Sequence, residues 1–179
     1  MDLIQVTGGF FWELINNKKV HLVGVDYNIA FCPTVVTDLK CSIPFKNAVA
    51  DSVIVSSFLY IGPDPEGLLE EVYRVLKSGG WILLTAPLVF PHNPEPTDYW
   101  RFTDEAPRLL LHRSGFAEVD ITPIGERFSA VAYLLSPFLR PRWLVAPFVY
   151  WLCLKLDAWT KGLGLQECHI GYVAKARKP

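Results

Sequence analysis

A proline-rich stretch in the middle of the chain gathers side chains that could move or orient a proton. It reads PHNPEPTDYWRFT, residues 91–103, and contains His92, Tyr99 and Arg101. A histidine can take a proton from a substrate hydroxyl, and a tyrosine or arginine can orient that hydroxyl. We therefore identify His92, Tyr99 and Arg101 as candidate catalytic residues. The alternative is structural: Asp98 and Arg101 would form an ion pair that fixes the loop, with the aromatic side chains packed inwards.

The preceding elements place this stretch at the end of a buried strand. Residues 64–78 predict a helix, with Asp64 as the N-cap and Pro65 in the first turn. Its apolar residues recur at helical spacing: Leu68, Leu69, Val72, Val75 and Leu76. Residues 79–80, two glycines, are expected to end the helix. Residues 81–90 are almost continuously apolar, which indicates a strand covered on both faces. Ligands of α/β folds bind beyond the carboxyl ends of such strands.

Several segments in this order carry a family resemblance. The stretch LLEEVYRVLKSGGWILLTAP resembles the segment reading RVLKPGG between the fourth and fifth strands of class I S-adenosylmethionine-dependent methyltransferases, type 11-like. IPFKNAVADSVIVSS precedes it, and the later DYWRFT is similar to the version found in many bacterial members. Together these segments cover roughly residues 20–123, and several segments in order are more specific than one.

The resemblance implies a single domain over residues 1–179 with an α/β, Rossmann-like, doubly wound and mostly parallel sheet. The expected inner strands are residues 20–26, 34–39 and 51–57, followed by a half-exposed strand at 116–122. Residues 170–176 would form an antiparallel last strand at the edge of the sheet.

The same resemblance implies that S-adenosyl-L-methionine is the cofactor. Asp26 would accept hydrogen bonds from both ribose hydroxyls, which the paired oxygens of a carboxylate suit. Asp38 and Leu39 match the position that lies against the adenine. Tyr27 and Ser57 complete this part of the expected cofactor site. For Asp26 and Asp38 the alternative is a simple turn or cap residue.

The beginning of the chain departs from the family pattern, in which the first strand ends in an acidic residue and a GxGxG loop. Asp2 can match the acid and Gly8 the last glycine, which puts Ile4 and Val6 at the first two glycine positions. Branched side chains resist the positive φ and close ligand approach that glycine allows. On this alignment the first strand is incomplete and the cofactor loop degenerate.

Composition narrows the function classes. The chain has 179 residues, 51% of them hydrophobic, and a net charge of −1, which gives no electrostatic indication of nucleic-acid binding. The cysteines lie at positions 32, 41, 153 and 168, without paired spacing or a histidine at zinc spacing, so we predict no metal site. Buried thiols in a reducing cytoplasm are the expectation. No basic region followed by an apolar run is visible at the N-terminus, and no uncharged run reaches the length of a membrane span.

Residues 128–159 form an apolar insertion before the last strand. Two apolar arms flank Arg140 and Arg142, and three tryptophans lie along the segment. We expect a pair of packed helices that cover a sheet face. The alternatives are contact with a membrane surface, a roof over an apolar substrate pocket, or a dimer contact.

The leading hypothesis for function is S-adenosylmethionine-dependent methyl transfer to a small-molecule or lipid- or sugar-linked acceptor. The alternative is a catalytically degenerate methyltransferase-like module that binds a ligand or partner. A dinucleotide-dependent enzyme is disfavoured because no GxGxxG follows a strand. The sequence leaves both the acceptor and the oligomeric state open.

Overall fold

The computed structural model describes residues 2–6, 21–31, 33–38, 42–94, 97–161, 163 and 168–179. The strands are β1 (Asp2–Val6), β2 (His21–Asp26), β3 (Val35–Val36), β4 (Ala50–Val55), β5 (Leu76–Pro87), β6 (Ala117–Ile124) and β7 (Gly171–Arg177). The helices are α2 (Pro65–Val75), α3 (Glu105–Arg113), α4 (Arg127–Leu135) and α5 (Arg142–Thr160), with short 3-10 turns η1 (Ile29–Phe31) and η2 (Ser136–Phe138).

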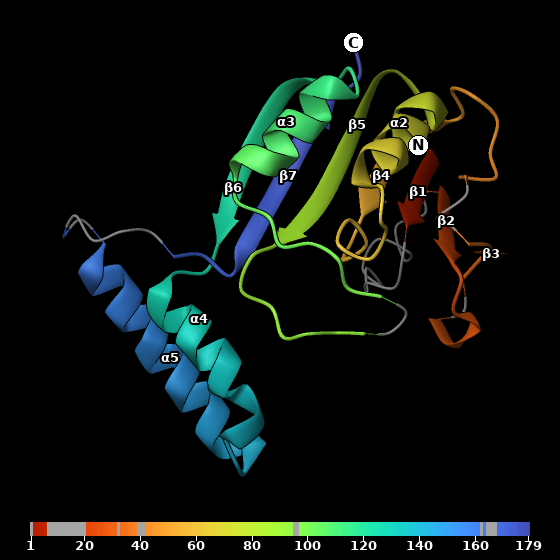
Figure 1. The fold of residues 1–179 in the computed structure, drawn as a ribbon. Coiled ribbons are helices and arrows are strands. Elements are labelled where there is room, and N and C mark those ends of the chain that lie inside the picture. Colours follow the sequence, from red (N-terminus) through yellow and green to blue (C-terminus); the bar gives the residue numbers. More distant parts are fainter. Residues whose placement is uncertain are drawn as a thin grey trace.

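All described strands lie in one sheet, in the order β3-β2-β1-β4-β5-β7-β6 (Figure 1). Pairing is parallel from β3 through β5, and β7 runs antiparallel to both β5 and β6. This confirms the predicted mostly parallel sheet with an antiparallel last strand.

The last strand does not lie at the edge of the sheet, so that part of the prediction was wrong. β7 is inserted between β5 and β6, and β6 forms the edge. The burial of the two strands agrees with this order. Tyr172, Ala174 and Ala176 of β7 are buried, whereas no residue of β6 is fully buried.

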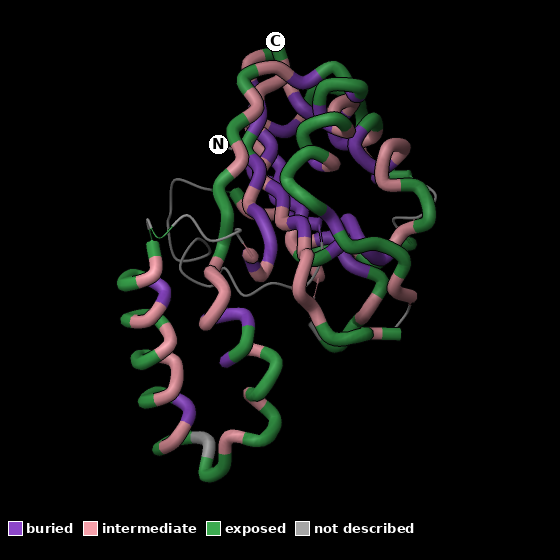
Figure 2. The backbone as a smooth tube through the Cα atoms, turned by 60° about the vertical axis from the view of Figure 1, so that its left-hand side comes forward, coloured by how far each residue is buried: buried purple, intermediate pink, exposed green. Residues whose placement is uncertain are grey.

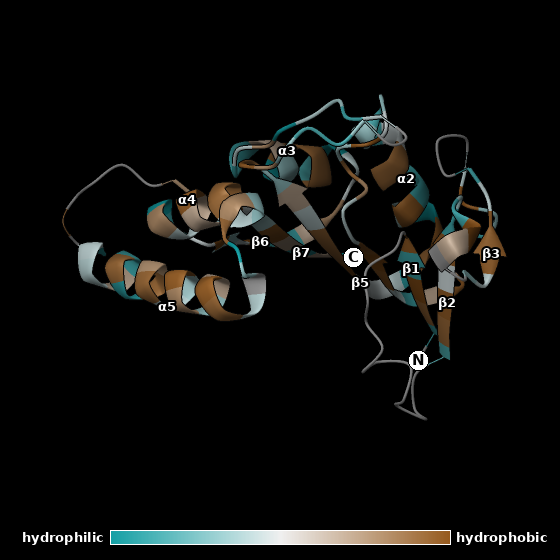
Figure 3. Cartoon of the chain, turned by 90° about the horizontal axis from the view of Figure 1, so that it is seen from below, coloured by the Kyte–Doolittle hydropathy of each residue, from teal (hydrophilic) through white to brown (hydrophobic). Residues whose placement is uncertain are grey.

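Helix α2 covers the centre of the sheet, and with α3 it lies on one face (Figures 1 and 3). The predicted start is confirmed: Asp64 accepts a hydrogen bond from the Gly67 N–H at 2.9 Å, and Pro65 opens the helix. Its buried residues, Leu68, Leu69, Val72 and Val75, are four of the five that the helical spacing identified, and the fifth, Leu76, belongs to β5. They join the core residues of β1, β4 and β5 in one hydrophobic cluster.

The predicted end of this helix was wrong. Helix α2 stops at Val75, because Leu76 is already extended and pairs with Ala50 at the start of β4. Gly79, with φ of 78°, lies inside β5 where the β4–β5 register shifts. Positive φ suits glycine because it lacks a Cβ atom. The double glycine therefore serves a strand irregularity and not a helix cap.

Gly80 lies where the backbone is crowded, which gives a stability prediction. A Cβ atom at Gly80 would come within 2.8 Å of the Lys77 carbonyl oxygen and 3.0 Å of the Asp51 carbonyl oxygen. We expect Gly80→Ala to lower the free energy of unfolding by about 2 kcal/mol, since neither backbone group can move away cheaply. Thermal unfolding followed by circular dichroism should show a Tm lower by roughly 4–8 °C. Gly62→Ala is the matched control, because nothing lies within 4 Å of its Cβ position. Equal Tm values for the two variants would contradict the argument.

Strand β1 corrects the prediction of an incomplete first strand. Residues Asp2–Val6 pair in parallel with β2 on one side and β4 on the other. Ile4 and Val6 are buried in the core, where branched side chains suit a strand. They therefore do not occupy the glycine positions of a loop.

The insertion forms a helical hairpin of α4, η2 and α5 (residues 127–160). The helices pack against each other, which confirms a helix pair. They extend away from the body of the molecule, so the expectation that they cover a sheet face was wrong (Figure 1). Buried residues concentrate in the sheet, whereas the hairpin is mostly exposed or half-buried (Figure 2). Among the described residues, no helix is long and apolar enough to cross a bilayer.

Candidate functional site

The sheet has a switch point beside β1, where the strand order reverses. β1 lies between β2 and β4, and all three run in the same direction. Their carboxyl ends, at Val6, Asp26 and Val55, therefore meet at one edge. The Ser56 N–H donates to the Val6 carbonyl at 3.2 Å, which holds β4 beside β1 up to this edge. Open α/β sheets bind their ligands at such a point.

Asp26 ends β2 at this edge and is 3% exposed. Its Oδ1 accepts a hydrogen bond from the Asn28 N–H at 2.8 Å, and its carbonyl accepts one from the Thr37 N–H at 3.1 Å. The turn role that the sequence left open is therefore present. A carboxylate has about four acceptor positions, so the same group can also receive ligand hydroxyls.

The neighbouring predicted contacts lie at the same edge. Tyr27 follows Asp26 directly and is 42% exposed. Asp38 is exposed and lies just beyond β3. Leu39 and Gly8, predicted as cofactor contacts, lie outside the described residues.

Ser57 lies just beyond β4 in a left-handed conformation, with φ of 53°. Its N–H donates to Thr85 Oγ1 on β5 at 2.8 Å. This bond turns the chain sharply after β4 and keeps the ends of β4 and β5 together.

Asp2 does not lie at this edge, which corrects its prediction as a cofactor contact. It begins β1, so it lies at the amino end of the sheet, opposite Asp26. There its N–H donates to Asp51 Oδ2 at 2.6 Å, and its carboxylate lies 3.6 Å from Lys77 Nζ. The Lys77 ammonium also lowers the pKa of Asp51, and Asp51 raises the pKa of Lys77. This exposed cluster fixes strand ends and leaves no role for Asp2 at the cofactor edge.

Gln5 is the residue that the sequence analysis missed. It is the penultimate residue of β1, 8% exposed, and two residues before Thr7-Gly8-Gly9 in the sequence. With β1 placed at Asp2–Val6, Gln5 takes the place of the acid expected near the end of the first strand. The sequence feature that could have identified Gln5 is the run LIQV, because its residues fit a buried central strand.

The loop between β5 and α3 is held by Asp98 and Arg101. Two guanidinium nitrogens of Arg101 donate to the two Asp98 oxygens at 2.5 and 2.7 Å, a bidentate pair. The same nitrogens donate to the carbonyls of Trp100, Phe90 and Pro91. The Asp98 side chain is 1% exposed. Arg101 holds the pKa of Asp98 at about 2, with help from the Asn93 N–H, and the pair raises the pKa of Arg101.

The loop is also tied to the segment after β4. Thr97 Oγ1 donates to the Ile61 carbonyl at 2.7 Å, and Trp100 Nε1 donates to the Gly62 carbonyl at 3.0 Å. The Tyr99 N–H donates to the Tyr60 carbonyl at 2.9 Å. These bonds make a defined rim at the carboxyl edge of the sheet.

The three predicted catalytic residues share this rim but differ in what they contact. His92 is exposed and the Tyr99 side chain is 55% exposed, so both can reach a ligand. Arg101 is engaged within the loop, and its guanidinium lies 5.9 Å from the Tyr60 ring centroid and 5.7 Å from that of Phe90. This geometry favours the structural alternative for Arg101.

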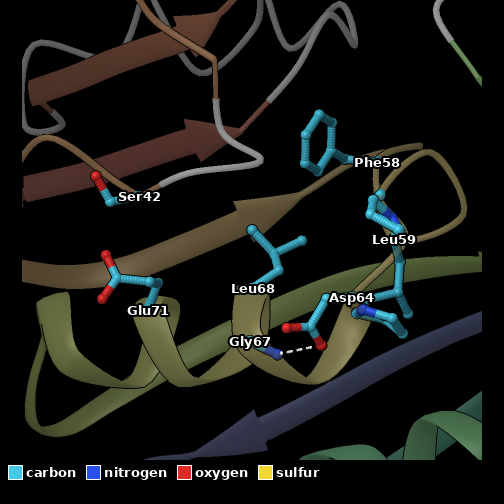
Figure 4. A pocket seen from close by; sticks show the side chains of 10 residues that line it. Ser42, Phe58, Leu59, Asp64, Gly67, Leu68 and Glu71 are labelled. Atoms are coloured by element: carbon cyan, nitrogen blue, oxygen red, sulfur yellow. Dashed lines mark hydrogen bonds between the residues drawn. The ribbon is translucent and has the colours of Figure 1, made fainter.

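A small cavity lies beside the start of α2 (Figure 4). It is lined by Ser42, Phe58, Leu59, Gly62, Pro63, Asp64, Pro65, Gly67, Leu68 and Glu71. Its volume of about 130 Å³ is below the ~300 Å³ at which small-molecule pockets begin.

Metal ligation finds no support in the part of the chain that the structure describes. No group of three His, Cys, Asp or Glu side chains there could hold an ion. Cys153 and Cys168 are free, half-buried thiols, and burial raises the pKa of Cys153. Cys32 and Cys41 lie outside the described residues.

Part of the chain matches a known protein family. Residues 6–84 match the family model described as a methyltransferase domain. A search of curated proteins gave no significant match.

Solved structures share the fold at low sequence identity. A phosphoethanolamine N-methyltransferase 2 of Haemonchus contortus, bound to phosphomonomethylethanolamine and S-adenosylhomocysteine, has a TM-score of 0.66 and 14% identity, with 99% of this chain and 49% of that one covered. A SAM-dependent methyltransferase from Archaeoglobus fulgidus has a TM-score of 0.64 and 21% identity, with 99% of this chain and 86% of that one covered. The [4+2]-cyclase SpnF has a TM-score of 0.64 and 17% identity, with 99% of this chain and 75% of that one covered. The chain thus spans about half the length of the Haemonchus enzyme.

Proposed function

The chain has the fold of class I methyltransferases and matches their domain model over its first half, and from this premise we propose that it transfers a methyl group from S-adenosylmethionine. The acceptor would be an oxygen, nitrogen or carbon atom of a small molecule or of a lipid- or sugar-linked molecule. One observation carries the proposal: Asp26, a buried carboxylate, ends β2 beside the point where the strand order reverses.

The described residues at the carboxyl edge fit the cofactor. Asp26 would receive the ribose hydroxyls, and Asp38 would lie against the adenine, with Tyr27 and Ser57 nearby. Leu39 and Gly8 belong to the same proposed set. The buried carboxylate at the end of β2 suits paired hydroxyl donors. When bound, S-adenosylmethionine supplies a methyl group on a positively charged sulfur.

The chain would contribute mainly alignment and exclusion of water. An in-line displacement depends strongly on holding the acceptor atom close to the methyl carbon. The rim that Asp98 and Arg101 fix would set the position of the acceptor. His92 could take the acceptor proton if the acceptor is a hydroxyl, and Tyr99 could orient it.

A non-catalytic binding or partner module is the second candidate, and Gln5 favours it. An amide at that position of β1 cannot provide the negative charge that an acid near the end of the first strand would provide. Only Gly8 and Gly9 follow in the sequence where the family has a three-glycine loop.

Calorimetric titration of the purified chain with S-adenosylmethionine and S-adenosylhomocysteine separates the two functions. The methyltransferase proposal expects micromolar binding of both ligands, because product and cofactor share the adenosine group. Screening of small-molecule and lipid-linked acceptors for formation of S-adenosylhomocysteine would then identify the acceptor class. A folded chain that binds neither ligand would overturn the proposal and favour the binding module.

A further inference from the structure

Exposed large apolar side chains are more frequent along the hairpin of α4, η2 and α5 than along the rest of the described chain. Its most exposed large side chains are Phe138 and Trp143 at the tip, each 79% exposed, and Trp159 near the base, 72% exposed. Further exposed apolar residues lie between them: Val131, Leu134, Leu135, Leu144, Phe148, Trp151, Leu152 and Leu154. Figure 3 shows both helices as predominantly hydrophobic. Contiguous patches of this kind mark binding surfaces.

The packing of the hairpin is reversed relative to a helix pair of a water-soluble core. Small residues, Ala130, Ala132 and Ala146, are buried in the hairpin, whereas no large aliphatic or aromatic residue of α4 or α5 is fully buried and many are exposed. Small residues between helices and large apolar residues outside are typical of helices surrounded by lipid.

The polar groups inside the hairpin follow the same reversal. Asp157 of α5 is 7% exposed and accepts hydrogen bonds from the N–H groups of Phe128 and Ser129 at 2.7 and 2.9 Å, and from the Ser129 hydroxyl. It caps the start of α4, whose own N-cap residue, Glu126, makes no side-chain capping hydrogen bond. The only acid of residues 127–161 is therefore turned inwards, where its charge does not meet the exposed face.

The charge of the hairpin is opposite to that of the rest of the chain. Residues 127–161, which are the hairpin and the lysine that follows it, hold five of the 17 Lys and Arg residues and one of the 18 Asp and Glu residues, a formal charge of +4. The rest of the chain carries −5. Arg140 at the tip and Lys155 on α5 are exposed. A basic, apolar surface beside an acidic body is complementary to an anionic lipid surface.

The width of the apolar surface also favours lipid over a second copy of the chain. The exposed apolar residues of α5 spread over about half of the helix circumference, at 100° per residue. A helix that packs on one partner needs a narrower stripe.

We propose that this hairpin lies in the interface of an anionic membrane and holds the chain there as a peripheral anchor. The tryptophans suit the membrane interface, since an indole ring is apolar and its N–H can donate a hydrogen bond to water. β6 is parallel to β5, because both run antiparallel to β7, and the hairpin follows β6 directly. It therefore leaves the sheet at the carboxyl edge, on the side of the candidate site, and α4 contacts the rim there through Tyr133, which stacks on Phe90.

Vesicle sedimentation with the full chain tests the proposal. The chain should bind vesicles of phosphatidylcholine with phosphatidylglycerol more tightly than vesicles of phosphatidylcholine alone, with a blue shift of tryptophan fluorescence. Phe148→Ser combined with Trp151→Ser should lower binding at least about tenfold, because two exposed aromatic rings are lost. Arg140→Gln combined with Lys155→Gln should lower binding to the anionic vesicles by about fivefold per residue and leave neutral vesicles unaffected.

Matched variants keep folding and membrane binding apart. Ile29→Ser combined with Val36→Ser removes two apolar side chains of similar exposure, 72% and 55%, far from the hairpin, and should leave binding unchanged. If the first aromatic variant fails to fold by circular dichroism, Phe138→Ser with Trp143→Ser at the tip replaces it. Absence of vesicle binding by the unaltered chain, or equal loss in the control, would overturn the proposal. A second result would also overturn it: light scattering shows a dimer that dissociates in the aromatic variant, and the unaltered chain does not bind vesicles. A second copy of the chain would then cover the apolar face.

Discussion

Replacing Asp26 with alanine should lower the affinity for S-adenosylmethionine at least about 100-fold. A hydrogen bond to a charged group contributes about 1.5–3 kcal/mol, two ribose hydroxyls would donate to this carboxylate, and each 1.4 kcal/mol is a factor of ten. Asp26 is 3% exposed, so little water could replace the lost oxygens. Calorimetric titration of the variant and the unaltered chain measures the change.

Two further variants separate the ligand from the turn. Asp26→Asn keeps an oxygen that accepts from the Asn28 N–H, so it should retain the turn. Because it lacks the negative charge, it should still bind S-adenosylmethionine more weakly than the unaltered chain. Asp2→Ala should leave the affinity unchanged, because Asp2 lies at the opposite end of β1. Unaltered affinity of Asp26→Ala would refute the assignment of the ribose site.

Replacing Arg101 with methionine should destabilise the fold by about 3 kcal/mol, since a buried carboxylate would lose its partner. The Asp98 side chain is 1% exposed and Arg101 donates to both of its oxygens. Thermal unfolding should show a Tm lower by roughly 6–12 °C. Glu118→Gln is the control, because its pair with Arg177 is exposed and should contribute less than about 1 kcal/mol.

The acid dependence of stability gives the same pair a second test. The pKa of Asp98 falls from 3.8 to about 2 on folding, so the ionised form is favoured in the folded chain. Its contribution, about 2 kcal/mol, is present above pH ~4 and is lost as the pH falls from ~4 to ~2. Urea unfolding at several pH values should show this loss in the unaltered chain and a smaller one in Arg101→Met. The same acid dependence in both chains would show that Arg101 does not set this pKa.

The central unit of the fold could be predicted because local and long-range preferences agree there. The spacing of apolar residues in α2 matched the face that is buried, and Asp64 and Pro65 have few better positions than a helix start. The buried strand β5 follows from its apolar run. Gly79 was misassigned because a positive φ is needed both at helix ends and in strand irregularities, and sequence alone does not distinguish them.

To predict the first and last strands of the sheet, one needs the register and the order of the strands. Local sequence patterns do not specify either. Matching the glycines of the family loop first assigned Ile4 and Val6 to that loop, so the sequence analysis missed the strand β1 and Gln5 within it. The antiparallel direction of β7 was predicted, whereas its insertion between β5 and β6 depends on pairing partners far away in the sequence. Of the site, Asp26 and the loop residues stay predictions; the ion pair of Asp98 and Arg101, one of two alternatives that the sequence left open, is present in the structure.

The hairpin was predicted as a helix pair, and its placement was wrong for a physical reason. Apolar residues at helical spacing predict burial, but they do not say what buries them. A sheet face, a second copy and a lipid surface all remove the same apolar area from water.

The position of β7 bears on how the chain is synthesised. β5 pairs with β7 from Trp81–Arg177 to Pro87–Gly171, and β6 pairs only with β7 among the described strands. During translation, one edge of β5 therefore stays unpaired while about 90 further residues are synthesised. β6 has no neighbour in the sheet until residues 171–177 leave the ribosome. An unpaired strand edge is a template for wrong pairing with another chain. Nascent chains stalled before residue 171 should consequently aggregate unless a chaperone covers that edge.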